Sequence, residues 1–160
     1  LDDYIQLNSR LQIFAPGRII RRRLMDQFGP IASGCPTEDT VIVLRALLLG
    51  GLCRVPIRVI QYRRPGDSAS SRGGLRRMNN RKIIEQYLAD ASCARGLRLI
   101  DGNVYACLVW RLRVEHMVRD SSYRFSPGTP IYYVHRLFAK VVVLAYKRCI
   151  YYWYSKNLHA

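Results

Sequence analysis

Apolar residues recur along this chain mainly at the three- and four-residue spacing of amphipathic helices. The clearest case follows residue 37, where Val41, Leu44 and Leu48 share one helical face. Thr37 is a suitable N-cap residue, and Gly50 begins a stop signal. We therefore expect a helix that starts directly after Thr37 and ends before Gly50.

The same spacing predicts helices in further segments of the chain. These segments are residues 1–11, 21–27, 78–95 and 104–118, and a last helix that begins at Pro130 behind a Thr129 cap. The last helix carries one apolar stripe along its length. The stripe consists of Val134, Leu137, Phe138, Val141, Ala145, Cys149 and Tyr152.

A period of two appears between residues 53 and 59, where apolar and polar positions alternate. The apolar members are Cys53, Val55, Ile57 and Val59, and Arg54, Pro56 and Arg58 lie between them. This alternation predicts a strand. Because Pro56 lacks a backbone N–H, we expect the strand at the edge of a sheet or at a bend.

Composition adds a strong preference for anionic partners. The 160 residues suit one domain, or one domain with an extension, and 49 % of them are hydrophobic, which is enough to build a core. Lys and Arg number 26 against 11 acidic residues, so the formal charge is +15. This balance favours nucleic acid, anionic lipid or phosphorylated substrates as partners. The imbalance is strongest from residue 121 to residue 160, where no Asp or Glu occurs.

Cysteine and histidine do not indicate a metal site. The five cysteines contain no C-x-x-C pair, and the three histidines lack the spacing of zinc ligands. No segment approaches the about 20 apolar residues of a membrane-spanning helix. The best candidate, residues 141–154, is interrupted by Lys147 and Arg148. The chain starts with Leu1 rather than Met, and we interpret it as a piece of a longer protein.

Two adjacent carboxylates, Glu38 and Asp39, open the helix predicted after Thr37. Negative charge in the first turn interacts favourably with the helix macrodipole, so the pair can be simple capping. A carboxylate at the mouth of a site can also act as a catalytic base. The local sequence alone favours capping.

Several segments in a fixed order carry a wider pattern. They are A-P-G-R-I-I-R-R (15–22), L-M-D-Q-F-G-P (24–30), T-E-D-T (37–40) with Leu44, Arg45 and Gly50, V-I-Q-Y-R (59–63) and S-A-S (68–70). Their order resembles that of the family 2 glycosyltransferases, which have a small-residue strand, a basic turn, F-G-P, an acidic helix start, and a strand ending in Y-R before a Ser-rich loop. The resemblance covers residues 12–75.

The resemblance implies an α/β architecture, the GT-A fold of nucleotide-diphospho-sugar transferases. Residues 1–95 would be the C-terminal portion of the catalytic domain, and residues 96–160 a basic, aromatic-rich helical extension. The implied activity is inverting transfer of a sugar from a nucleotide-sugar donor to a glycan or lipid-linked acceptor, as in polysaccharide biosynthesis. The family uses a divalent cation, Mg²⁺ or Mn²⁺, held by a D-x-D motif upstream of the matched region. The ligands are therefore expected mostly outside this chain, and we expect this fragment alone to be inactive.

The resemblance also implies roles for individual residues. Asp39 would be the base that removes the proton of the acceptor hydroxyl, and Glu38 would orient the acceptor or a neighbouring group. The remaining substrate-binding candidates are Gly17 and Arg18 at the sugar or acceptor pocket, and Tyr62, Arg63, Arg64, Ser68 and Ser70 around the leaving diphosphate. A plain turn and a solvated basic loop are the alternatives for these two groups. Many family members have a His shortly after Y-R, where this chain has Arg64-Pro65-Gly66.

The C-terminal stripe, with Tyr and Trp residues among Lys and Arg, favours a helix at an anionic membrane surface. The alternative is a helix packed on its own domain. For the whole chain we expect the cytoplasmic face of a bacterial membrane as its location. Two other functions compete with the transferase: a peripheral membrane adaptor, and a non-enzymatic nucleic-acid-binding protein. Nucleic acid is the less favoured partner, because no helix-turn-helix, RNP, KH or zinc-finger signature occurs.

Overall fold

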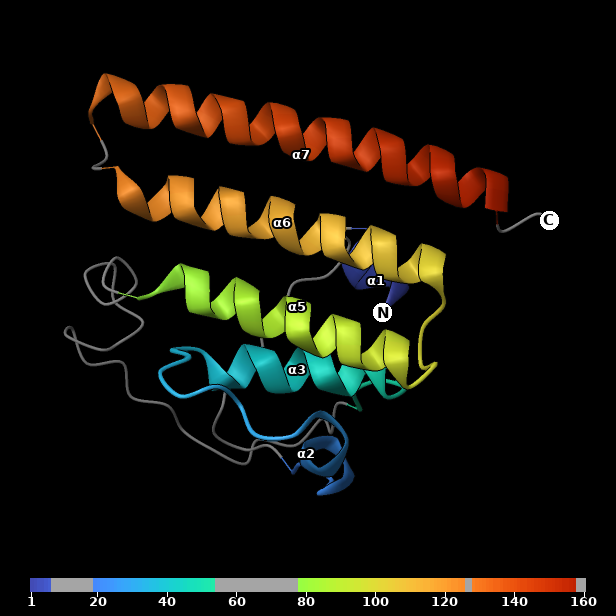
Figure 1. Cartoon of the computed structure of the whole chain (residues 1–160). Coiled ribbons are helices and arrows are strands. Elements are labelled where there is room, and N and C mark those ends of the chain that lie inside the picture. The colour runs from blue at the N-terminus through green and yellow to red at the C-terminus, as the bar shows by residue number, and fades with distance from the viewer. Residues whose placement is uncertain (7–18, 54–77, 126–127, 158–160) are drawn as a thin grey trace.

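The computed structural model describes residues 1–6, 19–53, 78–125 and 128–157. All regular secondary structure in these residues is helical (Figure 1). The helices are α1 (Asp2–Ile5), α2 (Arg23–Phe28), α3 (Glu38–Leu48), α5 (Asn80–Gly96), α6 (Gly102–Arg124) and α7 (Pro130–Asn157). The helices predicted after Thr37, from residue 78, from residue 104 and from Pro130 are therefore confirmed.

The predicted α/β architecture, the GT-A fold, is wrong for the part of the chain that the structure describes, because this part contains no strand. Its apolar residues follow the helical period, so each segment buries a stripe against another helix rather than one face of a sheet. Cys53, the first residue of the predicted strand, is not in regular structure, and the rest of that strand lies outside the described residues. Ile19 and Ile20, where the resemblance implies the end of a strand, are exposed and irregular.

The helices form a row in which neighbours pack side by side. α6 runs antiparallel to both α5 and α7, α3 covers the other side of α5, and α2 lies at the end of the row opposite α7 (Figure 1). α1 packs against α6. Among the described helices, α6 is the one that packs along α7, so α7 forms an edge of the row.

Local capping residues explain where the long helices begin. Asp101 accepts hydrogen bonds from the backbone N–H groups of Asn103 and Val104, both at 2.8 Å, so α6 starts two residues earlier than predicted. Asn79 caps α5 through the N–H of Lys82 at 3.2 Å. Pro130 occupies the first position of α7, where its missing N–H costs no helical hydrogen bond.

A single buried cluster draws residues from α1, α3, α5, α6 and α7. Tyr146 of α7 illustrates how distant segments meet in it. The Tyr146 hydroxyl donates to the carbonyl oxygen of Ile5 at 2.7 Å, and its ring meets that of Trp110 edge to face, with centroids 4.8 Å apart. The cluster contains residues on both sides of residue 96, the predicted boundary between the two parts of the chain.

Candidate interaction surface and the acidic helix start

Glu38 and Asp39 lie in the first turn of α3, as predicted. The Glu38 side chain is exposed and that of Asp39 is half-buried. An Asp39 carboxylate oxygen accepts a hydrogen bond from the N–H of Thr40 at 3.0 Å. Thr37 occupies the N-cap position, but its side chain makes no capping hydrogen bond. Asp39 thus accepts from a first-turn amide, which is the capping role that the local sequence favours, and its role as a catalytic base stays a prediction.

Two buried tyrosines, Tyr87 of α5 and Tyr4 of α1, act as hydrogen-bond donors. The Tyr87 hydroxyl donates to the hydroxyl oxygen of Thr40, and burial raises the pKa of Tyr87 to about 12. The Tyr4 hydroxyl donates to Glu115 at 2.7 Å, and burial, followed by the charge of Glu115, raises the pKa of Tyr4 well above its ordinary value. Both phenols therefore stay protonated near neutral pH and hold helices together rather than transfer protons.

The other predicted site residues lie outside the described residues. These are Gly17, Arg18, Tyr62, Arg63, Arg64, Ser68 and Ser70. Their assignment to the sugar, the acceptor and the diphosphate stays a prediction. Among the residues that the structure describes, no three or more His, Cys, Asp or Glu side chains gather in a group that could hold a metal ion. The Mg²⁺ or Mn²⁺ ion implied by the resemblance also stays a prediction, with ligands expected elsewhere.

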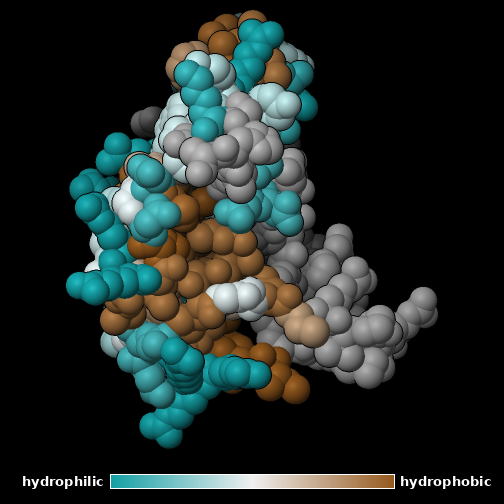
Figure 2. Space-filling view, turned by 90° about the vertical axis from the view of Figure 1, so that its right-hand side faces the viewer, coloured by the Kyte–Doolittle hydropathy of each residue, from teal (hydrophilic) through white to brown (hydrophobic). Residues whose placement is uncertain are grey.

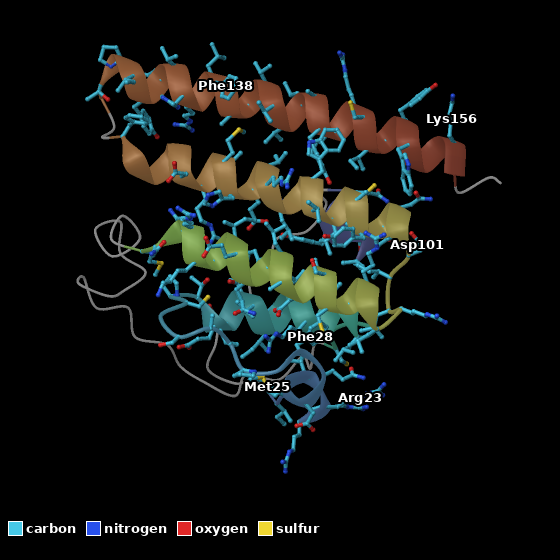
Figure 3. All side chains as sticks on the ribbon, viewed as in Figure 1. Arg23, Met25, Phe28, Asp101, Phe138 and Lys156 are labelled. Atoms are coloured by element: carbon cyan, nitrogen blue, oxygen red, sulfur yellow. The ribbon has the colours of Figure 1, made fainter. Side chains whose placement is uncertain are left out.

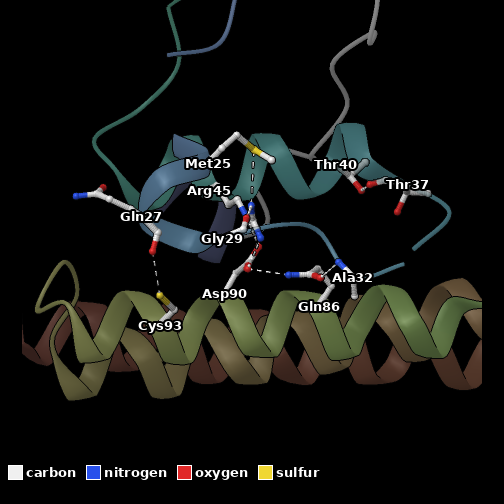
Figure 4. A network of polar contacts seen from close by, with 10 residues as sticks. All are labelled: Met25, Gln27, Gly29, Ala32, Thr37, Thr40, Arg45, Gln86, Asp90 and Cys93. Carbon is white, nitrogen blue, oxygen red and sulfur yellow. Dashed lines mark hydrogen bonds and ion pairs between the residues drawn. The ribbon is translucent and has the colours of Figure 1, made fainter. Parts of the chain in front are cut away.

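Sequence reasoning missed a buried ion pair between α3 and α5. Arg45 and Asp90 are fully buried, and the guanidinium donates to both Asp90 oxygens, from Nε at 2.7 Å and from Nη2 at 2.9 Å. Arg45 also donates to the carbonyl of Gly29 at 2.7 Å (Figure 4). Gln86 joins Asp90 to the N–H of Ala32, with both hydrogen bonds at 2.8 Å. The network ties the segment after α2 to α3 and α5, so its role is structural.

The sequence did contain a signal for this pair. Arg45 follows Val41 by four positions and precedes Leu48 by three, so it lies on the apolar side of the helix. Asp90 lies three positions after Tyr87 on the apolar side of α5. A charged residue within each of two apolar stripes indicates a buried pair, because an unpaired buried charge is costly.

The apolar stripe of α7 faces outward. We call Val134, Leu137, Phe138, Val141, Leu144 and Tyr152 the outer α7 face, and between 55 % and 65 % of each side chain is exposed. The helix packs through its opposite side, where Ala139, Tyr146 and Ile150 are buried. Phe138 on α7 and Arg23 on α2 mark opposite sides of the row of helices (Figure 3). The predicted stripe therefore exists, but it is not the side that forms the core.

Cations flank the outer α7 face. Arg136, Lys140 and Lys147 are exposed and follow one side of the helix, and we call them the basic flank. Apolar and hydrophilic residues lie side by side at the upper edge of the molecule, which α7 forms (Figure 2). The Lys156 ammonium lies 4.7 Å from the centre of the Tyr152 ring. None of the described helices, α7 included, has both the length and the hydropathy needed to cross a bilayer.

An open groove lies between α6 and the first half of α7, with a volume of about 550 Å³. We call it the α6–α7 groove. Its described lining residues are Val118 of α6 and Tyr132, Arg136, Ala139, Lys140, Val143 and Leu144 of α7. Arg136 and Lys140 of the basic flank line it, and Leu144 belongs both to the groove and to the outer α7 face. The groove therefore opens where the basic flank meets the outer α7 face.

Comparison of the chain with protein-family models, with curated proteins and with solved structures finds no match. The resemblance to family 2 glycosyltransferases, and the activity that it implies, therefore stay predictions.

Proposed function

We propose that this protein attaches peripherally to anionic membrane surfaces, with the outer α7 face lying in the lipid interface. The observation that carries the proposal is the exposure of the outer α7 face while the opposite side of α7 packs on α6. A helix that needs only one side for its own domain has a second apolar side available for another surface.

The geometry of the outer α7 face suits a helix lying flat on a membrane. The face extends from Val134 to Tyr152, about 27 Å at 1.5 Å per residue, and exposed Arg148 lies on it between Leu144 and Tyr152. Interfacial helices insert such a stripe to the level of the headgroups and the first acyl carbons. Tyr152 suits this level because its ring is apolar and its hydroxyl is polar.

The charge distribution favours anionic over neutral lipid. The basic flank lies beside the outer α7 face, and residues 121–160 contain no acidic residue that would oppose it. Each Lys or Arg near an anionic surface contributes about 1 kcal/mol to binding. The net charge of +15 adds a longer-range attraction that weakens as salt is added.

A vesicle flotation experiment tests this function. The 160-residue chain should float with vesicles containing 30 % phosphatidylglycerol and remain unbound with pure phosphatidylcholine. We expect Leu137→Glu/Phe138→Glu to weaken binding by about 30-fold or more, because two inserted side chains are lost and two like charges meet the lipid. The matched control, Ile19→Glu/Leu52→Glu, adds the same charges at exposed apolar positions away from α7 and should weaken binding far less.

Equal effects of the two double variants would contradict insertion of the outer α7 face, since charge alone would then explain binding. Binding to RNA with a steep salt dependence, without binding to the anionic vesicles, would instead support the nucleic-acid-binding function.

The sugar transferase is a second candidate, supported by the accessible position of Glu38 and Asp39 in the first turn of α3. Its test needs a chain extended by the nucleotide-binding half that the resemblance implies. There, Asp39→Asn should abolish transfer and leave the fold intact, because Asn keeps a hydrogen-bond acceptor but cannot take up the proton of the acceptor hydroxyl. Asp26→Asn, at an exposed carboxylate of α2, is the control and should retain transfer. Retained turnover in Asp39→Asn would exclude the assignment.

A further inference from the structure

We infer that the α6–α7 groove binds a single anionic phospholipid molecule, with the lipid phosphate at Arg136 and Lys140 and the start of an acyl chain along the apolar wall. The inference deepens the proposed function, on which it rests, by naming the ligand that α7 selects from an anionic membrane. The observation that carries it is the meeting of paired cations and apolar side chains in one open groove.

The size of the groove suits part of a lipid. Its volume of about 550 Å³ falls within the roughly 300–1,000 Å³ of small-molecule sites. A phosphate headgroup and the first carbons of one chain fit such a space, while the rest of the lipid remains in the bilayer.

Arg136 and Lys140 form the polar wall of the groove. They are four residues apart on α7, so their side chains project from the same side of the helix one turn apart. The Arg136 guanidinium donates to the Tyr132 hydroxyl at 3.4 Å and lies 6.0 Å from the centre of that ring, so Tyr132 helps to orient it. A planar guanidinium can hold two phosphate oxygens, and an ammonium one turn away can hold a third.

No acidic side chain is among the described residues that line the groove. α6 carries two acids near this end, Glu115 and Asp120, and neither lines the groove. Glu115 is paired with Arg111 at 2.9 Å and with Arg119 at 3.4 Å. The two groove cations therefore offer a local positive charge, which an anionic ligand neutralises.

The apolar wall distinguishes a lipid from free phosphate. It consists of Val118, Ala139, Val143 and Leu144, which offer a phosphate ion no hydrogen-bond donor from their side chains. Leu144 also belongs to the outer α7 face, so an acyl chain on this wall continues directly into the membrane on which α7 lies. A lipid uses both walls, whereas a phosphate ion uses only the cations.

The test uses a lipid that needs no membrane. Dihexanoyl phosphatidylglycerol, kept below the concentration at which it forms micelles, is titrated into the 160-residue chain in a calorimeter. We expect saturable binding of one lipid per chain, and at least tenfold weaker binding of dihexanoyl phosphatidylcholine. Arg136→Gln/Lys140→Gln should weaken binding of the anionic lipid at least tenfold.

A matched control removes the same charge elsewhere. Arg23→Gln/Arg113→Gln neutralises two exposed cations that do not line the groove and should change lipid affinity less than twofold. Val143→Phe leaves every charge in place but fills part of the groove, and it should also weaken binding about tenfold. All these positions are exposed or half-buried, so the variants are expected to fold.

Several results would overturn the inference. Absence of saturable lipid binding, or an equal loss in the groove variant and in its control, would exclude the groove as a lipid site. Inorganic phosphate that displaces the lipid at equal concentration would identify a phosphate site instead. If the chain floats with anionic vesicles but does not bind the short lipid, the groove assignment fails and the membrane function stands. The reverse result would retain the groove and exclude the membrane function.

Discussion

The contact between α3 and α5 and the surface of α7 distribute their charges in opposite ways. Between α3 and α5 a complete Arg–Asp ion pair is buried, and both Asp90 oxygens accept hydrogen bonds. On α7 the apolar side chains of the outer face are exposed, and the charges beside them are exposed cations. One region therefore completes its polar contacts internally, and the other presents apolar and cationic groups that no described part of the chain covers.

Stability and recognition therefore depend on different regions of this chain. A buried charge persists where its partners are fixed in place, so the network around Arg45 marks a part of the fold that cannot change without large cost. An exposed apolar stripe adds little to stability and makes a contact surface available. Substitutions in the two regions should accordingly affect different measurements.

Breaking the buried ion pair should cause the largest loss in the free energy of unfolding. Asp90→Asn leaves the Arg45 charge buried without its counter-ion, and we expect a loss of roughly 3–5 kcal/mol in the free energy of unfolding. Glu85→Gln breaks the exposed pair with Arg81 on the same helix and should cost less than about 0.5 kcal/mol. Urea unfolding measures the free energy of unfolding of both variants. Similar losses in the two variants would show that burial does not govern this pair.

A Leu-to-Ala substitution can be made both in the buried cluster and on the outer α7 face. Leu108 is fully buried in α6 and Leu137 is 65 % exposed on α7. We expect Leu108→Ala to cost roughly 3 kcal/mol and Leu137→Ala to stay within about 0.5 kcal/mol of the unchanged protein. Thermal unfolding at several protein concentrations measures this difference. A large loss from Leu137→Ala would mean that the outer α7 face is covered in solution.

Alkaline pH should weaken the buried region. The unfolded chain releases the Tyr87 proton near pH 10, whereas burial raises the pKa of Tyr87 in the folded protein to about 12. The contribution of Tyr87 is fully present below pH 10 and is lost as the pH rises towards 12, by roughly 2–3 kcal/mol, because the unfolded state then binds fewer protons. Urea unfolding between pH 9 and pH 11.5 measures the slope.

Tyr87→Phe serves as the control for this titration, since it removes the ionisable group and should make the slope shallower. An unchanged slope would assign the alkaline loss to other groups, such as Tyr4, whose pKa burial also raises.

The helices were predictable because their signals are local. Thr129 and Pro130 predicted the start of α7, and the acids after Thr37 predicted the start of α3. The end of α6 was not predictable in the same way, since the helix continues past the predicted end at Val118 through the polar stretch 119–124. Packing between helices decides such ends, and packing is not a local property.

The fold class was not predictable, because the α/β expectation depended on one short alternating segment and on the resemblance. Of the alternating segment, Cys53 is described and is not in a strand. The direction of the α7 stripe was also open, since a stripe of seven apolar residues is consistent with a core face or an outward face. The predicted stripe faces outward because α7 has a second apolar side, which is buried and consists of Ala139, Tyr146 and Ile150.

The hydrogen bond from Tyr146 to Ile5 joins positions 141 residues apart. During synthesis, α1 cannot complete this contact until the segment containing Tyr146 has left the ribosome, which at 5–20 residues per second takes about 7–28 s. Until then, the surface that Tyr146 buries in the folded protein stays exposed. The cluster around α1 is thus a late step of folding, and a chain released before α7 emerges would expose it to chaperones and proteases.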